Sequence, residues 1–433
     1  MTAHYDVVVA GGGSAGVAAA IAARRAGART LLLEAGPCLG GAATMRNVLT
    51  YCGIYTREDP PRQVLYGVAD EVLQALRSLG AVSAPTRFTS VAVVFDPESV
   101  KYVLDRLCSQ AGVDVQLQSR LVAAHREGGR IGGVDVADHQ GVRRITGTTF
   151  IDATGEADLA TFGGATVRYG NGGLVQNGTL GVRFGGIPPG AVVTRESLFE
   201  AIVSAKTLGA PLNAERGLVA RLPISGDVVA YVVDEGYDAR DAVEVTRAQV
   251  NSRSAARHYL EALRTLPGCT NAYIVSTGPE IGTRESRHIV GRYQLSGDEV
   301  LSGARFDDVI ALGAWPVEYH PGPGLAPQWE FLANDGYYDI PLRILHSIDT
   351  ENLFAAGRTV DGDRRAGASL RAMGTAFATG QAAGAAAALL AEYGTVADYR
   401  QVQQLLRTQH AHVPSTCSAA APVGGPTASR GSE

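Results

Sequence analysis

The chain has 433 residues, 45% of them hydrophobic and 19% charged, and this length predicts two domains rather than one core. The formal net charge of −5 argues against binding of nucleic acid or an anionic membrane, and no apolar run reaches membrane-spanning length. No charged and apolar leader precedes the first predicted strand, so we expect a cytoplasmic protein. The composition is also compatible with a homo-oligomer.

The cysteines are few and scattered, and none forms a Cys-x-x-Cys pair. This pattern indicates reduced thiols rather than a disulfide framework, and it predicts no metal site. The five residues are Cys38, Cys52, Cys108, Cys269 and Cys417.

The first 34 residues carry the most informative pattern. A buried strand over Tyr5–Ala10 runs into the turn Gly11-x-Gly13-x-x-Gly16, and an Ala-rich helix is predicted over 14–27. Such a turn lets the backbone approach a pyrophosphate, and the helix directs its N-terminal amides at it. Glu34 follows at the distance where a carboxylate accepts hydrogen bonds from an adenosine ribose. A Gly-rich turn in an unrelated α/β domain is the alternative, and it leaves Glu34 unexplained.

Further elements follow from periodicity and from the turn residues between them. Helices are predicted over 62–79, 97–111, 241–266, 370–393 and 396–410. Strands over 113–117, 121–125, 131–137 and 143–151 predict an inserted β-meander, and the last of them enters the turn at Phe150–Glu156. Short strands are also predicted over 228–233 and 352–356.

These elements predict an α/β fold with a Rossmann-like dinucleotide-binding domain, an inserted β-meander and a mixed α+β substrate domain. We expect the nucleotide-binding domain to comprise 1–165 and 341–412, and the substrate domain to comprise 166–340. Residues 413–433 are rich in Pro, Gly, Ser and Ala, which predicts a disordered tail.

Several stretches together resemble the FAD-dependent oxidoreductases of the glutathione-reductase-like superfamily. They are Gly11–Glu34, Gly40–Thr44, Phe150–Glu156, Gly282–Tyr293, Asn352–Arg358 and Ser369–Gly374. The resemblance implies a Rossmann-like FAD-binding domain with FAD as a noncovalent cofactor, since no attachment residue stands out. It implies these cofactor-binding residues: Gly11, Gly13, Ser14, Ala15, Gly16, Glu34, Ala35, Gly41, Ala42, Thr44, Val122, Ala153, Thr154, Gly155, Gly357, Arg358, Arg371, Met373, Gly374 and Thr375.

Two departures from better-known relatives narrow the chemistry. Disulfide reductases carry a cysteine pair after the glycines at 40 and 41, but here Ala42–Met45 follows, which excludes dithiol exchange. Many members place an Asp where this chain has Arg358, so the contact to the ribityl chain is open between Asp361, Asp363 and main chain.

Two clusters are candidates for catalysis. Arg284 and Arg287 could clamp a carboxylate or another anion, because guanidinium groups bind carboxylates bidentately; an interdomain ion pair is the alternative. Glu318, Tyr319 and His320 lie in a Pro/Gly-rich loop, where an acid or imidazole could act as general base and the phenol could donate a hydrogen bond. A purely structural loop is the alternative.

The resemblance implies an FAD-dependent oxidoreductase, and we expect a dehydrogenase or oxidase that transfers a hydride from a small or medium organic substrate to flavin N5. Dioxygen or another carrier would reoxidise the flavin. A monooxygenase or reductase using NAD(P)H is the first alternative, and a flavoprotein that binds or modifies RNA is an alternative of another class. Substrate identity does not follow from the fold.

Overall fold

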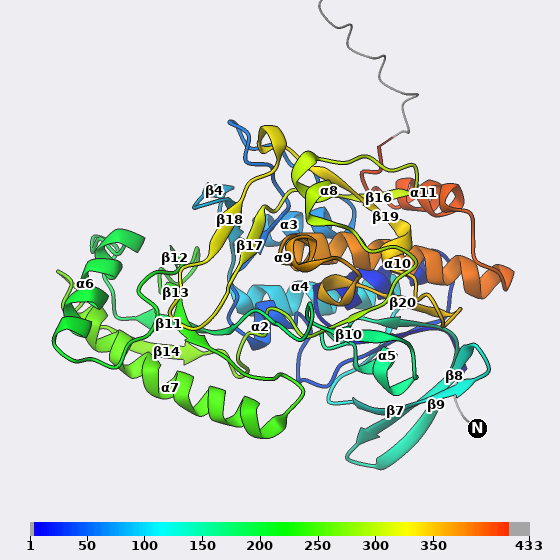
Figure 1. Ribbon diagram of the computed structural model, residues 1–433, viewed down its shortest axis with the longest axis horizontal. Helices are drawn as coiled ribbons and strands as arrows, with labels where there is room; N and C mark the ends of the chain where they lie inside the picture. The colour runs from blue at the N-terminus through cyan, green and yellow to red at the C-terminus, as the bar shows by residue number, and fades with distance from the viewer. Residues whose placement is uncertain (1–3, 415–433) are drawn as a thin grey trace, which may run out of the picture.

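The computed structural model describes residues 4–414, and its centre is a sheet whose main strands run parallel (Figure 1). The parallel strands are, in spatial order, β6 (Asp114–Gln116), β2 (Thr30–Leu33), β1 (His4–Ala10), β9 (Gly141–Asp152) and β20 (Leu353–Ala355). The β1 and β2 strands carry unbroken runs of Val or Leu, as expected for parallel strands buried on both faces. The α/β class predicted from the sequence is confirmed.

Two antiparallel strands extend this sheet. The strands β7 (Arg120–Glu127) and β8 (Arg130–Asp138) pair with one another, and β8 pairs with the first half of β9. The predicted meander is therefore present, but its first strand was assigned wrongly. The segment at 113–117 forms β6, which pairs in parallel with β2 at the edge of the main sheet. Periodicity gives the strand but not its partner, because pairing is decided by tertiary packing.

Each face of the main sheet is covered by a different set of elements. One face packs against α1 (Ser14–Arg25), α3 (Val68–Ser78), α4 (Pro97–Ala111) and α10 (Met373–Tyr393), with α11 (Tyr399–Thr408) beyond them. The other face packs against the β7–β8 hairpin and α5 (Asp158–Phe162). Alternate residues at the end of β1 pack into the two cores, with Val7 and Val9 on one side and Val8 and Ala10 on the other.

The helices α1 and α10 pack unusually closely. An added Cβ at Gly380 would lie 2.1 Å from the carbonyl oxygen of Ala15, and one at Gly384 would lie 2.1 Å from that of Ala19. Small residues at this spacing therefore let the two backbones touch. The contact holds the N-terminus of α10 beside the glycine turn that precedes α1, which places two helix N-termini near one another.

Gly16 is a second site of close approach, and it provides a stability prediction. A Cβ there would lie 1.7 Å from the carbonyl oxygen of Gly11, so Gly16→Ala must push the turn away from α1. We expect this overpacking to lower the free energy of unfolding by about 1–3 kcal/mol, measured by urea denaturation. Gly129→Ala is the control, because a Cβ at Gly129 meets no atom within 4 Å. Equal urea midpoints for the two variants would contradict the packing described.

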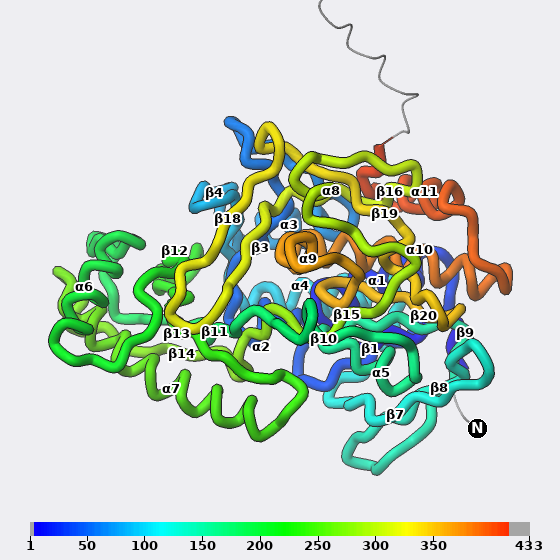
Figure 2. The backbone as a smooth tube through the Cα atoms, in the orientation of Figure 1, coloured from blue at the N-terminus to red at the C-terminus, as the bar shows by residue number. Residues whose placement is uncertain are grey.

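A second sheet with its own hydrophobic core lies at the other side of the molecule (Figure 2). Its strands, in spatial order, are β12 (Val219–Arg221), β13 (Val228–Glu235), β11 (Gly178–Gly185) and β14 (Tyr273–Thr277). The helices α6 (Arg195–Thr207) and α7 (Ala242–Arg264) contribute to its core. The Asp241 carboxylate caps α7 by accepting a hydrogen bond from the Val243 amide.

Small sheets and short helices connect these two parts. The small sheets are β3 (Thr50–Cys52) with β5 (Val91–Val94) and β4 (Thr86–Arg87), β10 (Val167–Tyr169) with β15 (Arg287–Ile289), β16 (Val309–Gly313) with β19 (Tyr338–Pro341), and β17 (Val317–Tyr319) with β18 (Gln328–Glu330). The short helices are α2 (Ala42–Met45), α8 (Gly297–Ser302) and α9 (Arg364–Leu370), with single 3-10 turns at Ala333–Asp335, Leu342–Ile344 and Gly357–Thr359.

Three helices begin later than their sequence patterns predict, and the last of them, expected from residue 396, begins at Tyr399. The helix expected from residue 62 begins at Val68, because Gly67 has a φ of 65° and ends the preceding loop. The helix expected from residue 370 is divided: α9 ends at Leu370, Ala372 is extended, and α10 begins at Met373. Because of this break, α10 has its own N-terminus at Met373, separate from α9.

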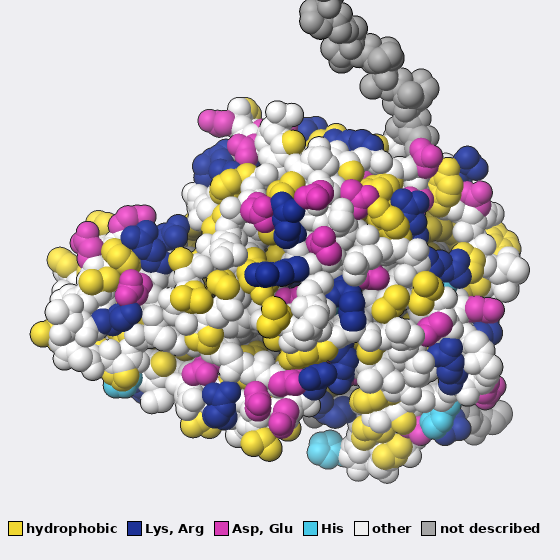
Figure 3. Space-filling model, viewed as in Figure 1, with side chains coloured by type: hydrophobic (Ala, Val, Ile, Leu, Met, Phe, Trp, Pro, Cys, Tyr) yellow, Lys and Arg dark blue, Asp and Glu magenta, His cyan; other side chains and the backbone are white. Residues whose placement is uncertain are grey.

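The surface and the chain ends add two observations. On the face shown in Figure 3, Lys and Arg side chains are interspersed with Asp and Glu side chains. No helix within residues 4–414 has the length and apolar character needed to cross a membrane. Most of the predicted tail, residues 415–433, lies outside the described residues.

Candidate cofactor and substrate site

A cavity of about 1180 Å³ lies where the carboxyl ends of β1 and β2 face the second sheet. Ligands of parallel α/β sheets bind at this end of the strands. The volume exceeds the usual range for a single drug-sized ligand, so the cavity has room for a large cofactor together with a substrate.

Most residues predicted to contact the cofactor line this cavity. They are Gly11, Gly13, Ser14, Ala15, Glu34, Ala35, Gly41, Ala42, Ala153, Thr154, Gly155, Gly357, Arg358, Arg371 and Met373. Five others do not line it. Gly16 and Gly374 pack against backbone, Thr44 donates a hydrogen bond to the carbonyl of Leu39, Thr375 is fully buried, and Val122 is replaced in the lining by Leu121.

One end of the cavity fits a nucleotide. Gly13 caps α1 with no side chain over the helix end, and the first amides of a helix have no partner within it. The buried hydroxyl of Ser14 has no hydrogen-bond partner among residues 4–414. The Glu34 carboxylate reaches back across the turn, accepting hydrogen bonds from the amides of Gly12 at 2.6 Å and Gly36 at 2.5 Å. Anionic phosphate oxygens fit at these amides, and ribose hydroxyls fit at the carboxylate.

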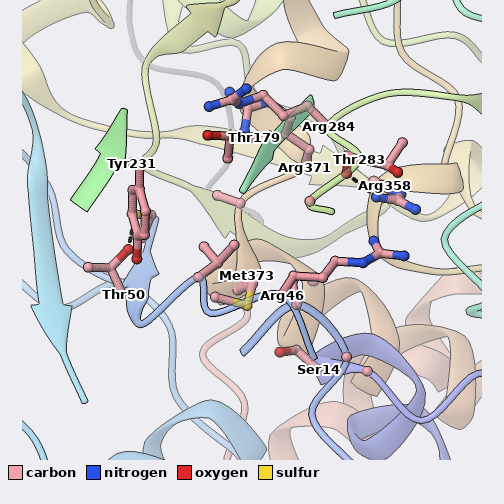
Figure 4. Close-up of a pocket in the computed structure, with 18 of the residues that line it drawn as sticks. Ser14, Arg46, Thr50, Thr179, Tyr231, Thr283, Arg284, Arg358, Arg371 and Met373 are labelled. Atoms are coloured by element: carbon pink, nitrogen blue, oxygen red, sulfur yellow. Dashed lines mark hydrogen bonds between the residues drawn. The ribbon is translucent and has the colours of Figure 1, made fainter. Parts of the chain in front are cut away.

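The N-terminus of α10 borders the middle of the same cavity. Met373 and Ala376 line it, and the buried hydroxyl of Thr375, in the first turn of the helix, has no hydrogen-bond partner in the described part of the chain. Figure 4 shows Met373 between Ser14, at one end of the site, and the pair Arg284 and Arg371 near the other. An elongated cofactor with a pyrophosphate near α1 and an electron-accepting ring near α10 fits this arrangement, as FAD does.

The side chain of Arg358 forms hydrogen bonds and an ion pair with other residues of the protein. Its guanidinium group donates to the carbonyl oxygens of Gly155, at 2.5 Å, and Thr283, and it forms an ion pair with Glu156. It therefore ties the turn after β9 to the loop before β15 while still lining the cavity. Asp361 and Asp363, the other candidates for a ribityl contact, are absent from the lining. Asp361 pairs with Arg168, and Asp363 caps α9.

The candidate catalytic residues divide into two groups. Arg284, Glu318 and His320 line the cavity, whereas Arg287 and Tyr319 do not. Arg287 donates to an Asp158 carboxylate oxygen at 2.9 Å and to the carbonyl of Glu156. The buried ring of Tyr319 is covered by the guanidinium group of Arg364 at 3.8 Å.

Arg371 takes the place beside Arg284 that Arg287 was expected to occupy. Its Nη2 donates to the carbonyl of Glu318 at 2.8 Å and to Oε2 of the same residue at 3.2 Å. Nε2 of His320 lies 3.2 Å from the other carboxylate oxygen of Glu318. We define Arg284, Glu318, His320 and Arg371 as the polar cluster of the cavity.

Burial and charge set the protonation states in the polar cluster. Burial raises the pKa of Glu318, but the adjacent His320 and the guanidinium groups of Arg371 and Arg284 outweigh it and bring this pKa to about 2. Burial and the charge of Arg284 lower the pKa of His320 to about 4, although Glu318 opposes them. At neutral pH the cluster thus holds a carboxylate, a neutral imidazole and two guanidinium cations.

Several lining residues carry no recognisable signal in the sequence. Trp315 and Trp329 form an aromatic wall with ring centroids 5.9 Å apart, and the indole of Trp315 donates to Glu318. Asp234 and Arg46 come from β13 and from the loop after α2. Only the fold brings these residues to one cavity. Within residues 4–414 no group of three His, Cys, Asp or Glu residues could hold a metal ion.

Several solved structures resemble this chain at low sequence identity. A geranylgeranyl bacteriochlorophyll reductase-like protein from Thermoplasma acidophilum is 13% identical, with 94% of this chain and 83% of that chain covered and a TM-score of 0.46. The p-nitrophenol 4-monooxygenase PnpA from Pseudomonas putida is 11% identical, with 94% and 84% covered and a TM-score of 0.47. The anhydrotetracycline hydroxylase OxyS from Streptomyces rimosus is 13% identical, with 94% and 68% covered and a TM-score of 0.45.

A search of the curated proteins gives no significant match. The family model described as FAD dependent oxidoreductase matches residues 6–407, which is nearly the whole described chain. The match spans both glycine turns, the N-termini of α1 and α10, and the polar cluster. The chain belongs to the FAD-dependent oxidoreductase family, and FAD is its cofactor.

Proposed function

We propose that this oxidoreductase dehydrogenates an organic substrate and that His320 accepts the proton released from the substrate. The observation that carries the proposal is a neutral, buried imidazole that lines the cavity next to a carboxylate. Loss of hydrogen from a CH–OH or CH–NH group needs an acceptor for the O–H or N–H proton. Bound FAD supplies N5 as the acceptor of the other hydrogen with its two electrons.

The neighbours of His320 are suited to this role. Its Nε2 is buried and lies 3.2 Å from Oε1 of Glu318, so this nitrogen would carry the proton of the neutral imidazole and Nδ1 would accept the proton of the substrate. The ionised Glu318, 3.2 Å away, stabilises the imidazolium that forms when the proton arrives. The main-chain amide of His320 donates to the side chain of Gln176, which fixes the loop that carries the imidazole.

The test is an anaerobic absorbance measurement on the FAD-bound protein. Hydroxy acids, amines, alcohols, NADH and NADPH are added separately, and bleaching of the flavin bands reports reduction. We expect at least one organic compound to bleach the flavin without a pyridine nucleotide. Bleaching by NADH or NADPH alone would replace the proposal with a reductase or a monooxygenase.

The protonation state of His320 leads to a pH prediction. A protonated imidazole cannot accept a proton, so kcat/KM should fall as pH falls through the pKa of His320, which is about 4. Above about pH 5 this group should leave kcat/KM unchanged, because the imidazole is then neutral in the free enzyme. Steady-state kinetics between about pH 3.5 and 8 measures the dependence of kcat/KM on pH. The absorbance of the flavin bands shows at each pH whether the protein still holds FAD. An inflection of kcat/KM near pH 6.5 that disappears in His320→Ala would contradict the account.

A further inference from the structure

The polar cluster contains two buried arginines whose hydrogen-bonding capacity is largely unused. The side chain of Arg284 is 12% exposed, and that of Arg371 is 15% exposed. Each guanidinium group has five N–H donors. Arg284 donates from Nη1 to the carbonyl of Asn177 and lies 3.9 Å from Asp234. Within the described residues, Arg371 donates from Nη2 alone, to Glu318, and its buried Nε has no hydrogen-bond partner.

Two acidic side chains, Glu318 and Asp234, pair with the two guanidinium groups of the cluster. Glu318 supplies one negative charge for the two guanidinium cations, because its pKa of about 2 keeps it ionised. Asp234 supplies a second: its Oδ1 lies 3.9 Å from Nη1 of Arg284, and its charge is the largest that opposes the lowering of the Arg284 pKa by burial. The unused N–H donors of the two guanidinium groups therefore favour a ligand that presents acceptor oxygens, and an anionic ligand forms the stronger hydrogen bonds with them.

We propose that the polar cluster binds the carboxylate of an organic acid, so that the substrate of the proposed dehydrogenation is a carboxylic acid. Guanidinium groups match the planar carboxylate with paired, charge-assisted hydrogen bonds. The aromatic wall of Trp315 and Trp329 beside the cluster provides an apolar surface for the rest of the acid.

Binding of the acid has a consequence for His320. Both Arg284 and Arg371 lower the pKa of its imidazole. A carboxylate bound between the two arginines compensates their charge, and the imidazole then becomes a stronger base. Binding of the substrate acid thus raises the pKa of His320, the group that accepts the proton of the substrate. This inference rests on the proposed dehydrogenation, whereas the binding of the carboxylate itself can be measured without turnover.

The experiment is a calorimetric titration of the FAD-bound protein with three aromatic acids of increasing size and their neutral amides. The pairs are benzoate and benzamide, phenylacetate and phenylacetamide, and indole-3-acetate and indole-3-acetamide. We expect at least one acid to bind roughly tenfold or more tightly than its amide. We expect Arg284→Gln to weaken that acid roughly 10- to 100-fold and to leave the amide unchanged, since a charge-assisted hydrogen bond is lost.

A matched control comes from another half-buried arginine. Arg183 lies on β11, pairs with Asp227 at 2.6 Å and does not line the cavity. Arg183→Gln removes the same charge and should leave the affinity for the acid unchanged. If Arg284→Gln does not fold or retain FAD, the comparison of acid with amide in the unaltered protein decides the question alone.

Two results would overturn the proposal. One is that no acid binds more tightly than its amide, and the other is that phenyl phosphate binds more tightly than every acid. The outcome is separable from that of the proposed function. Tight binding of an acid without reduction of the flavin by any organic compound would overturn the dehydrogenation and leave the carboxylate site standing. Reduction of the flavin by neutral compounds only would support the dehydrogenation and overturn the carboxylate site.

Discussion

Replacement of Gly13 by aspartate is expected to yield a folded protein that has lost its FAD. Gly13 has a φ of −71°, and an added Cβ would meet only the Cα of Gly41, at 3.8 Å. Aspartate is also among the favoured residues at the N-cap of a helix, so α1 should be stabilised. The new carboxylate would stand where the pyrophosphate approaches the helix. Repulsion between charges about 4 Å apart is worth about 4 kcal/mol near a protein surface, so we expect FAD to bind at least roughly 100-fold more weakly.

Gly13→Asn is the matched control for this variant. Asparagine has nearly the same shape and caps helices equally well, but it carries no charge. The difference in FAD affinity between the two variants, measured by fluorescence titration of the apoproteins, isolates the electrostatic part of the effect. If Gly13→Asp bound FAD as tightly as Gly13→Asn, the N-terminus of α1 would not be the pyrophosphate site.

Replacement of His320 by alanine is expected to slow reduction of the flavin by substrate about 10²- to 10⁴-fold, the usual contribution of a general base. Reduction is followed by anaerobic stopped-flow absorbance with the substrate found in the bleaching assay. FAD content should be unchanged, because the contacts predicted for the cofactor come from α1, α10 and the glycine turns.

Added imidazole distinguishes a general base from a structural residue. An external base should partly restore the rate in His320→Ala and leave the unaltered enzyme unaffected. Glu318→Gln should also be slower than the unaltered enzyme, because it loses the negative charge that stabilises the imidazolium. A rate for His320→Ala within about twofold of the unaltered rate would remove His320 from the mechanism.

The parts of the fold with strong local signals could be predicted from the sequence. The strand, glycine turn and helix of the first 25 residues are present, and α4 has the predicted bounds Pro97–Ala111, with Asp96 as its N-cap. These elements combine a sharp boundary with a clear period, so local chemistry is sufficient. The first residues of α3 and α10 could not be predicted from the sequence, because a positive φ at Gly67 and the break at Ala372 depend on tertiary contacts.

The candidate site was only partly predictable, because side-chain direction depends on the fold. Arg284 and Arg287 are three residues apart, yet one faces the cavity and the other faces Asp158, since β15 begins at Arg287 and the preceding loop turns inward. Arg371 was assigned to the cofactor, and its contact with Glu318 spans 53 residues of chain. No local pattern predicts such a contact. The glycine turns were easier to predict from the sequence, since phosphate binding requires a particular backbone geometry that glycine provides.

A crystal structure of the FAD-bound protein soaked with an acid identified by calorimetry tests the central claim most directly. The account predicts the pyrophosphate at the N-terminus of α1, the ribose at Glu34 and the flavin ring beside Met373. It also predicts the carboxylate between Arg284 and Arg371, with the substrate within hydrogen-bonding distance of His320. A flavin ring far from the polar cluster, or an acid bound elsewhere with the two arginines facing only protein, would contradict the account.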